Sequence, residues 1–341
     1  MTNETSLSSV FGVKAPASAV IVGNLGKGSN IQVNESYVFR PWLLKLLMLW
    51  WSGRINRRMY LFGPTGSGKS TIIEQFGARM GFPVFRIGVH NRLEFNETLG
   101  SIQLVQVNGN VDKESDSESK TGMLGMLGLM VKAIKRLADS NVTTKFIHAE
   151  LGQALVASSN QKVIVLIDEV DQGHPSQNMA WNKLLDECPL TLPTGETISP
   201  DNIWIAATGN TGFEDERGLY RGTQRQNIAF KSRFGIHEEI GYPDADVELE
   251  ILAKVTKSLD VKMRTQMQSF AQEMRNLFVS GEINVPLATR TLINWAKMTE
   301  SLNGMPGVSP FKRALELTFS NQCSSDEKQV ISGAWQRFSG E

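Results

Sequence analysis

The chain has 341 residues, enough for two domains, and its 41% hydrophobic and 21% charged content is ordinary for a soluble globular protein. Thirty-five basic residues balance 35 acidic ones, so no overall field favours nucleic acid or an anionic membrane. Two cysteines and four scattered histidines show no disulfide framework and no metal-ligand spacing, so the sequence predicts no zinc or iron site.

The N-terminus lacks the basic start and apolar core of a signal peptide. The apolar stretch Trp42–Trp51 is about half the length needed to span a bilayer and contains Lys45, so it predicts a buried or interfacial helix. Two unpaired cysteines suit a reducing compartment. We therefore expect a cytoplasmic protein without membrane contact.

The first 36 residues are polar and rich in Ser, Asn and Gly, apart from two short apolar groups, Val10–Val13 and Ala19–Val22. We interpret this segment as an N-terminal arm or a partner contact. The segment from Phe39 to Trp51 is predicted to form a helix, which Ser52-Gly53 ends before the next strand.

A glycine-rich motif follows, with the spacing G-x-x-x-x-G-K-S. It lies between an apolar run, Met59–Phe62, and a helical pattern, Lys69–Met80. In this context glycines let backbone N–H groups approach phosphate oxygens, lysine reaches the β- and γ-phosphates, and the serine hydroxyl ligates Mg²⁺. The sequence thus predicts a site for ATP and Mg²⁺. Its residues are Gly63, Pro64, Thr65, Gly66, Ser67, Gly68, Lys69, Ser70 and Thr71.

After this motif, Pro83–Val89 reads as a second buried strand, and the alternation of strand and helix predicts a parallel sheet with covered faces. The pattern then loosens, which predicts an insertion at about 107–145. Its charged part, Val111–Lys120, cannot bury a core and is interpreted as a solvated loop. Its Met/Gly part, Gly122–Met130, suits core packing or, alternatively, an adaptable contact surface.

A continuous apolar run, Lys162–Ile167, predicts a strand buried on both faces, and it ends in Asp168-Glu169. Ligands bind at the carboxyl ends of parallel strands in open α/β sheets. We expect Asp168 to hold the Mg²⁺ shell and Glu169 to polarise the water that attacks the γ-phosphate.

Another apolar strand, Ile203–Ala207, leads to Asn210, whose amide can complete the water-orienting set. Arg233 precedes a predicted edge strand, Ile236–Ile240, and either neutralises transition-state charge or forms a surface salt bridge. The basic cluster Arg54–Arg58 has no interleaved aromatic platform, so a solvated surface or subunit contact is favoured over nucleic-acid binding.

The order of these motifs resembles an AAA+ ATPase. Gly63–Ser70 matches Walker A, Val163–Glu169 matches Walker B, Asn210 the sensor-1 residue, Ser232–Phe234 the arginine-finger motif and Arg290 the sensor-2 residue. Nearly end to end, the chain is similar to the MoxR-like branch and specifically to the CobS family, the ATPase subunits of aerobic cobalt chelatase. The matching stretches are Val10–Val13, Glu74-Gln75, Ala78-Arg79, Asp171, Gly173, Gly218–Asn227, Arg290–Ala296 and Trp335–Phe338.

The resemblance implies an α/β AAA+ P-loop domain with a parallel five-stranded sheet, followed by a small all-helical lid domain. The expected boundaries are 1–36 for the arm, 37–243 for the nucleotide-binding domain and 244–341 for the lid. The resemblance also implies a homo-hexameric ring in which Arg233 reaches the next subunit's ATP, and it allows Arg290 to act across the interface as well. A hairpin at Leu190–Ile198 would face the pore or a partner. A von Willebrand A-type protein is the implied partner.

Two functions follow from these observations. The first is an ATP-driven ring that remodels a partner protein complex, as in the CobS family. The alternative is a phage or mobile-element ATPase acting in DNA replication, recombination or packaging. The balanced charge favours the first, because DNA-threading rings usually carry a basic stripe, so nucleic acid is not indicated as a partner. The insertion departs from the CobS pattern, which leaves cobalt chelation open, and no residue identifies the client.

Overall fold

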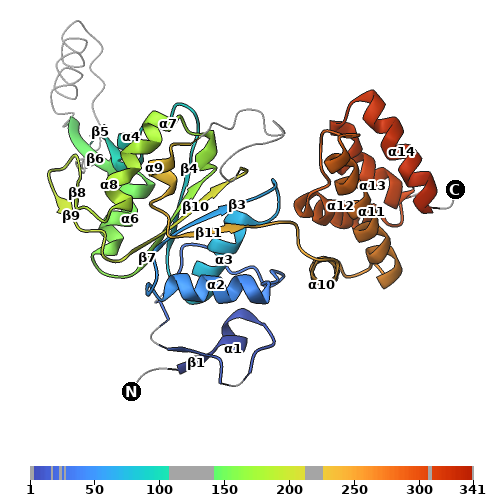
Figure 1. Cartoon of the computed structure of the whole chain (residues 1–341), viewed down its shortest axis with the longest axis horizontal. Helices are drawn as coiled ribbons and strands as arrows, with labels where there is room; N and C mark the ends of the chain where they lie inside the picture. The colour runs from blue at the N-terminus through green and yellow to red at the C-terminus, as the bar shows by residue number, and fades with distance from the viewer. Residues whose placement is uncertain are drawn as a thin grey trace, which may run out of the picture.

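The computed structural model describes residues 4–16, 18–22, 25–26, 28–106, 142–211, 226–305 and 309–339. Figure 1 shows a layered α/β part followed by an all-helical C-terminal part. Among the described residues, no helix combines the length and apolarity needed to cross a bilayer.

The α/β part is built on one five-stranded sheet in the order β11-β3-β10-β7-β4, and every neighbouring pair is parallel. The strands are β3 (Arg58–Phe62), β4 (Val84–Gly88), β7 (Val163–Asp168), β10 (Ile203–Gly209) and β11 (Ile236–Glu239). Every residue of β7 and β10 is buried, which explains their continuous apolar sequences. The predicted parallel five-stranded sheet is confirmed.

Helices cover both faces of the sheet (Figure 1). Side chains that alternate along each strand belong to different cores: Met59 and Leu61 pack with α2 and α3, whereas Tyr60 packs with α6 and α8. The helices of this part are α2 (Pro41–Trp51), α3 (Lys69–Met80), α4 (Phe95–Leu99), α6 (Glu150–Ser158), α7 (Pro175–Asn178), α8 (Asn182–Leu185) and α9 (Ile228–Lys231), with 3₁₀ turns η1 (Val170–Gln172) and η2 (Met179–Trp181). The predicted helix ending at Trp51 therefore forms as α2.

The N-terminal segment, interpreted as an arm or a partner contact, packs against the α2 and α3 layer. It contains β1 (Glu4–Ser6), α1 (Leu7–Phe11) and β2 (Val20–Val22), with β1 and β2 antiparallel. The Phe11 ring is 2% exposed and stacks on Phe76 with centroids 5.6 Å apart. The segment therefore extends the core of the sheet domain, because its apolar groups cover the outer side of α3.

Two antiparallel hairpins lie outside the main sheet. The first pairs β5 (Gly100–Gln106) with β6 (Val142–His148), and the second pairs β8 (Leu190–Thr191) with β9 (Thr197–Ile198). The second is the predicted hairpin at Leu190–Ile198. The first was not anticipated from the sequence. Residues 107–141, which hold the charged and Met/Gly runs, lie outside the described residues, as does most of the Gly218–Asn227 match.

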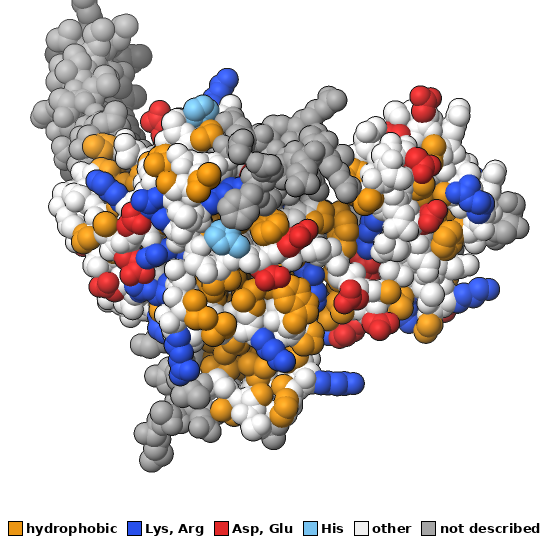
Figure 2. All heavy atoms as spheres, viewed as in Figure 1, with side chains coloured by type: hydrophobic (Ala, Val, Ile, Leu, Met, Phe, Trp, Pro, Cys, Tyr) orange, Lys and Arg blue, Asp and Glu red, His pale blue; other side chains and the backbone are white. Residues whose placement is uncertain are grey.

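The C-terminal part consists of helices around a separate core that includes Phe270 and Trp295. These helices are α10 (Ala245–Val255), α11 (Val261–Ser280), α12 (Thr289–Leu302), α13 (Pro310–Thr318) and α14 (Ser325–Ser339), with the 3₁₀ turn η3 (Ser320–Gln322). Figure 2 shows hydrophobic side chains gathered over α2 and the N-terminal elements rather than over the helical part. On α2, the side chains of Trp42 and Leu49 are 45% and 42% exposed.

Candidate nucleotide site

The glycine-rich motif forms the loop between β3 and α3, at the carboxyl end of the sheet. Gly68 precedes α3 with a left-handed backbone, and the helix begins at Lys69. Gly66 also has a left-handed backbone, with φ +75°, and a Cβ there would lie 2.6 Å from the Ala288 Cβ. A glycine fits both conditions, and it lets the loop approach Ala288, the residue that precedes α12.

Lys69 lies inside this loop. Its side-chain Nζ donates to the backbone oxygens of Gly63 at 2.8 Å and Pro64 at 2.9 Å, and to Asn210 Oδ1 at 3.3 Å. Burial lowers the pKa of Lys69 to about 8, and the nearby carboxylates of Asp171 and Asp168 oppose this only in part. The loop therefore holds a desolvated cation at the place where a phosphate would be received.

The lowered pKa of Lys69 makes a testable prediction. In the ligand-free protein the amine is mostly charged at pH 7 and mostly neutral at pH 9, and a bound phosphate favours the charged form. ATP binding should therefore take up about one proton at pH 9 and little at pH 7, and its affinity should fall as pH rises. Calorimetry in two buffers of different ionisation enthalpy measures this uptake. Lys69→Arg should remove the pH dependence, and its persistence in that variant would contradict the assignment.

Asp168 is the last residue of β7 and lies beside Ser70, the other residue predicted to hold Mg²⁺. The hydroxyls of Ser70 and Thr208 donate to Asp168 Oδ1, and the Arg86 guanidinium binds Oδ2, with its Nε at 2.9 Å. Burial alone would raise the pKa of Asp168, but these hydrogen bonds and the Arg86 charge outweigh it and keep the pKa below its usual value. An ionised carboxylate next to a hydroxyl supplies the oxygen ligands that Mg²⁺ prefers.

Arg86 is a contributor that the sequence analysis did not identify. It lies on β4, next to β7 in the sheet, and it also pairs with Glu74 of α3 at 3.0 Å. The sequence could have indicated Arg86, because it is a charged residue inside the predicted strand Pro83–Val89. A charged side chain is rarely buried in a strand unless it has a partner. Its function here is to hold the Asp168 carboxylate in place.

Glu169 follows Asp168 with a left-handed backbone, φ 57° and ψ 42°, and its side chain is exposed. Its backbone N–H donates to Thr208 Oγ1 at 3.1 Å. This conformation costs about 1–2 kcal/mol for a non-glycine residue, so the fold maintains it against local strain. The turn directs the chain away from β7 immediately after the buried Asp168, and it leaves the Glu169 carboxylate free in solvent.

Asn210 lies just beyond β10, where its Oδ1 accepts from Thr65 Oγ1 at 3.1 Å as well as from Lys69. Its backbone is held by Asp171, whose Oδ2 accepts from the N–H groups of Asn210 at 2.6 Å and Thr211 at 3.0 Å. Asp171 is fully buried, and burial raises its pKa. The sequence match included Asp171 but gave it no role; the structure shows that it anchors the Asn210 turn.

We expect Asp171→Ala to retain ATP binding but to lower turnover on the order of 10²-fold, because Asn210 would shift away from the phosphate loop. Asp171→Asn should retain most turnover, since one amide oxygen can still accept both N–H groups. Steady-state kinetics and a thermal melt of both variants test this. Equal turnover in the alanine variant and the parent protein would remove Asp171 from the site.

The two predicted arginines lie in different places. Arg290, at the start of α12, lines a pocket of about 220 Å³ together with Ser67, Gly68 and Thr71 of its own chain. Arg233 follows α9, is 27% exposed, and its Nε pairs with Asp186 Oδ1 at 2.9 Å. Arg233 has no hydrogen bond to the phosphate loop of its own chain among the described residues. The structure thus brings together Lys69, Ser70, Asp168, Asn210 and Arg290, and it leaves Arg233 apart.

The pocket beside the phosphate loop has apolar walls from both parts of the chain. Its apolar side chains include Val38, Val247, Ile251, Val255 and Ile293. Two residues that the sequence analysis missed bind the loop here. Arg40 donates to the oxygens of Ser67 at 3.3 Å and Gly241 at 3.0 Å, and the Tyr242 hydroxyl donates to the oxygen of Thr65 at 3.1 Å. No local sequence pattern marks these contacts.

Comparison with known proteins gives matches over most of the chain. Residues 58–234 match the model of the AAA domain (dynein-related subfamily), and residues 248–333 match the CbbQ/NirQ/NorQ C-terminal family. The chain is 27% identical over 293 residues to the aerobic cobaltochelatase subunit CobS of a Sinorhizobium species, covering 84% of this chain and 76% of that protein.

An uncharacterized protein of Staphylococcus haemolyticus is 26% identical over 285 residues, covering 82% of this chain and 90% of that protein. Among solved structures, a mutant of RuvB from Thermotoga maritima aligns with a TM-score of 0.46 at 11% identity, covering 84% of this chain and 69% of that chain. The AAA domain match alone spans more than half of the chain. The chain therefore belongs to the AAA family of ATPases, and the prediction of an AAA+ ATPase of the MoxR-like branch is confirmed.

Proposed function

We propose that this ATPase hydrolyses ATP with Mg²⁺ in a ring of identical subunits that remodels a partner protein complex. The observation that supports hydrolysis is the meeting of Lys69, Ser70, Asp168 and Asn210 through direct hydrogen bonds, with Glu169 next in the chain. The apolar pocket beside them suits an adenine ring, and Arg290 lies at its edge.

Each residue has a separate role in this proposal. Lys69 neutralises the β- and γ-phosphates, Ser70 and Asp168 hold Mg²⁺, and the metal supplies charge neutralisation. Glu169 polarises the attacking water. This role requires a carboxylate that is not held in an ion pair with another side chain. Asn210 orients the same water or the γ-phosphate. Arg86 and Asp171 keep Asp168 and Asn210 in position.

The position of Arg233 supports the ring. An arginine finger must approach the γ-phosphate, and this guanidinium is directed to Asp186 rather than to the phosphate loop of its own chain. We propose that it enters the site of the neighbouring subunit, in a hexamer as the resemblance implies. Arg290 would act on the nucleotide of its own chain; a further contribution across the interface stays a prediction.

A protein complex as the client and a von Willebrand A-type protein as the partner are what the resemblance to the CobS family implies, and we propose both for this chain. The DNA-directed alternative has the neutral overall charge against it. Phosphate release by the purified protein, measured with ATP and Mg²⁺, with EDTA, and with added duplex DNA, tests both proposals. We expect hydrolysis that EDTA abolishes and DNA leaves unchanged. Absence of hydrolysis in every condition would contradict the proposal, and several-fold stimulation by DNA would favour the alternative.

A further inference from the structure

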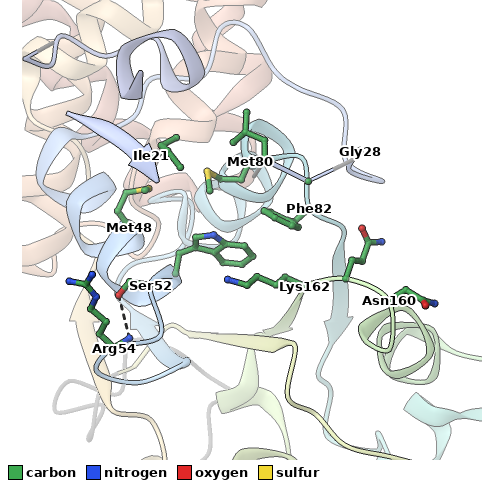
Figure 3. A pocket seen from close by; sticks show the side chains of 13 residues that line it. Ile21, Gly28, Met48, Ser52, Arg54, Met80, Phe82, Asn160 and Lys162 are labelled. Carbon is green, nitrogen blue, oxygen red and sulfur yellow. Dashed lines mark hydrogen bonds between the residues drawn. The ribbon is translucent and has the colours of Figure 1, made fainter. Parts of the chain in front are cut away.

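The two ends of the sheet differ in how their side chains are used. Figure 3 shows Met80, Phe82 and Lys162 beside a cavity at the end opposite to the nucleotide pocket. Met80 and Phe82 are buried, the Phe82 ring packs on Trp51 with centroids 4.7 Å apart, and the Lys162 amine lies 5.3 Å from the Trp51 centroid. These groups already have partners within the chain. Near the other end of the sheet, the helical part contains a buried ion pair whose contacts lead to the nucleotide pocket itself.

The ion pair joins α10 to α11. Glu248 is fully buried and Arg275 is 4% exposed. Arg275 Nη1 donates to Glu248 Oε2 at 2.9 Å, and Nη2 donates to Oε1 at 2.7 Å. Removing two charges from water is costly, and apolar residues of similar size can often replace such a pair without loss of stability. The stability of the helical core alone therefore does not account for this pair.

The same two side chains also hold the start of α12. Arg275 Nε donates to the backbone oxygen of Leu287 at 2.9 Å, and the Thr289 hydroxyl donates to Glu248 Oε1 at 2.7 Å. Thr289 is 7% exposed and is the first residue of α12, immediately before Arg290. The ion pair therefore fixes the backbone from which the Arg290 side chain extends.

The phosphate loop touches two segments that Arg275 contacts. The Arg275 guanidinium lies 4.3 Å from the centroid of the Tyr242 ring, and the Tyr242 hydroxyl donates to the backbone oxygen of Thr65 at 3.1 Å. The next residue, Gly66, lies so close to the start of α12 that a Cβ on it would be 2.6 Å from the Ala288 Cβ. The contacts of the ion pair thus extend to the phosphate loop by two routes, one through Tyr242 and one through the residues that precede Arg290.

We propose that Glu248 and Arg275 are positioning residues of the nucleotide site. Their buried pair holds Thr289, and the fixed backbone keeps Arg290 within reach of the bound phosphates. This inference rests on the proposed role of Arg290 toward the nucleotide of its own chain, whose pocket it lines together with the phosphate loop. A long side chain binds a ligand more tightly when its backbone is already fixed, because less freedom is lost on binding. Positioning accounts for the direction of every contact of the pair described above.

A double-mutant cycle between Thr289 and Arg290 tests this proposal. Thr289→Val removes the hydroxyl that donates to Glu248, Arg290→Ala removes the cation, and a third variant carries both changes. Calorimetry with Mg²⁺ measures the binding of adenylyl imidodiphosphate, an ATP analogue that is not hydrolysed, so the readout does not require turnover. We expect each single variant to bind about 10-fold more weakly than the parent protein, the scale of one charge-assisted hydrogen bond. The double variant should bind no more weakly than Arg290→Ala.

Thr299→Val is the matched control for Thr289→Val. Thr299 also lies on α12 and is 1% exposed, and its hydroxyl donates to the backbone oxygen of Trp295 at 2.9 Å. The control therefore removes a buried hydroxyl from the same helix without changing a residue that lines the nucleotide pocket. We expect Thr299→Val to bind the analogue like the parent protein, and a thermal melt verifies that both valine variants are folded.

A variant that combines Glu248→Leu with Arg275→Met separates positioning from stability. The two apolar side chains are similar in size to those they replace, so the fold should be retained. Leu287 and Thr289 nevertheless lose their partners. We expect a folded protein that binds the analogue at least about 10-fold more weakly than the parent protein. If this variant does not fold, the cycle between Thr289 and Arg290 decides alone.

The outcomes distinguish a failure of positioning from a failure of the proposed function. If Arg290→Ala binds the analogue like the parent protein, the proposed role of Arg290 is wrong, and positioning fails with it. If Arg290→Ala binds weakly but Thr289→Val, or the folded apolar-pair variant, binds like the parent protein, positioning alone is overturned. Additive losses in the double variant, or equal weakening by Thr299→Val, would also overturn it, because both results indicate a general structural effect.

Discussion

Lys69→Ala is expected to abolish nucleotide binding, whereas Glu169→Gln is expected to retain ATP and stop its turnover. The first change removes the cation inside the phosphate loop, where it now binds the oxygens of Gly63 and Pro64. The second removes only the exposed carboxylate that would polarise the water, and it leaves the Asp168 arrangement intact. A binding titration with a fluorescent ATP analogue and a phosphate-release assay on both variants measure the two effects.

Glu187→Gln serves as the control for Glu169. Among the described residues, Glu169 and Glu187 are the two non-glycine positions with a left-handed backbone, at φ 57° and 58°. Glu187 pairs with Arg57 and Arg58, both at 2.6 Å. Glu187→Gln therefore makes the same change, glutamate to glutamine at a left-handed position, away from the nucleotide site. We expect Glu187→Gln to hydrolyse ATP normally. Hydrolysis by Glu169→Gln at the parent rate would make the catalytic assignment wrong.

Arg233→Ala is expected to bind ATP normally and to lose hydrolysis by a factor of about 10³ or more, the scale of other arginine fingers. The alternative for Arg233 is a surface salt bridge, for which the observed pair with Asp186 is the evidence. An exposed pair of this kind contributes about 0–1 kcal/mol to stability, and its loss would not affect turnover on that scale.

Asp186→Asn distinguishes the two roles of Arg233. It breaks the same ion pair but keeps the guanidinium, so we expect turnover close to that of the parent protein. A surface salt bridge predicts similar and small effects for Asp186→Asn and Arg233→Ala. If Arg233 is an arginine finger, only Arg233→Ala should lose most of its turnover. Turnover is measured as phosphate release at saturating ATP.

The sequence was sufficient to predict the parts of the fold and site that depend on local patterns. The loop from Gly63 to Gly68 has fixed spacing, and β7 and β10 are buried on both faces, so their apolar runs are continuous. Asp168 ends β7 and Asn210 follows β10. These strands are parallel neighbours, so both residues lie at the same edge of the sheet. These features can be recognised one segment at a time.

Other features depend on contacts between distant segments and could not be predicted. Arg40 binds Ser67 across 27 positions and Tyr242 binds Thr65 across 177, and neither arginine nor tyrosine is unusual in its own surroundings. The packing of Phe11 on Phe76 was missed because a short apolar group in a polar segment has no periodicity. The β5–β6 hairpin was missed because residues 107–141 separate its two strands in the sequence.

In the proposed ring, one chain completes the ATP site of another, and this can be tested by mixing two inactive variants. Arg233→Ala retains Glu169, and Glu169→Gln retains Arg233, so a mixed ring contains interfaces of one orientation with both groups intact. Phosphate release is measured across mixing ratios, with mixed rings verified by mass. We expect activity to appear on mixing and to be highest near equal amounts. Activity no greater than that of either variant alone, in rings shown to be mixed, would contradict it.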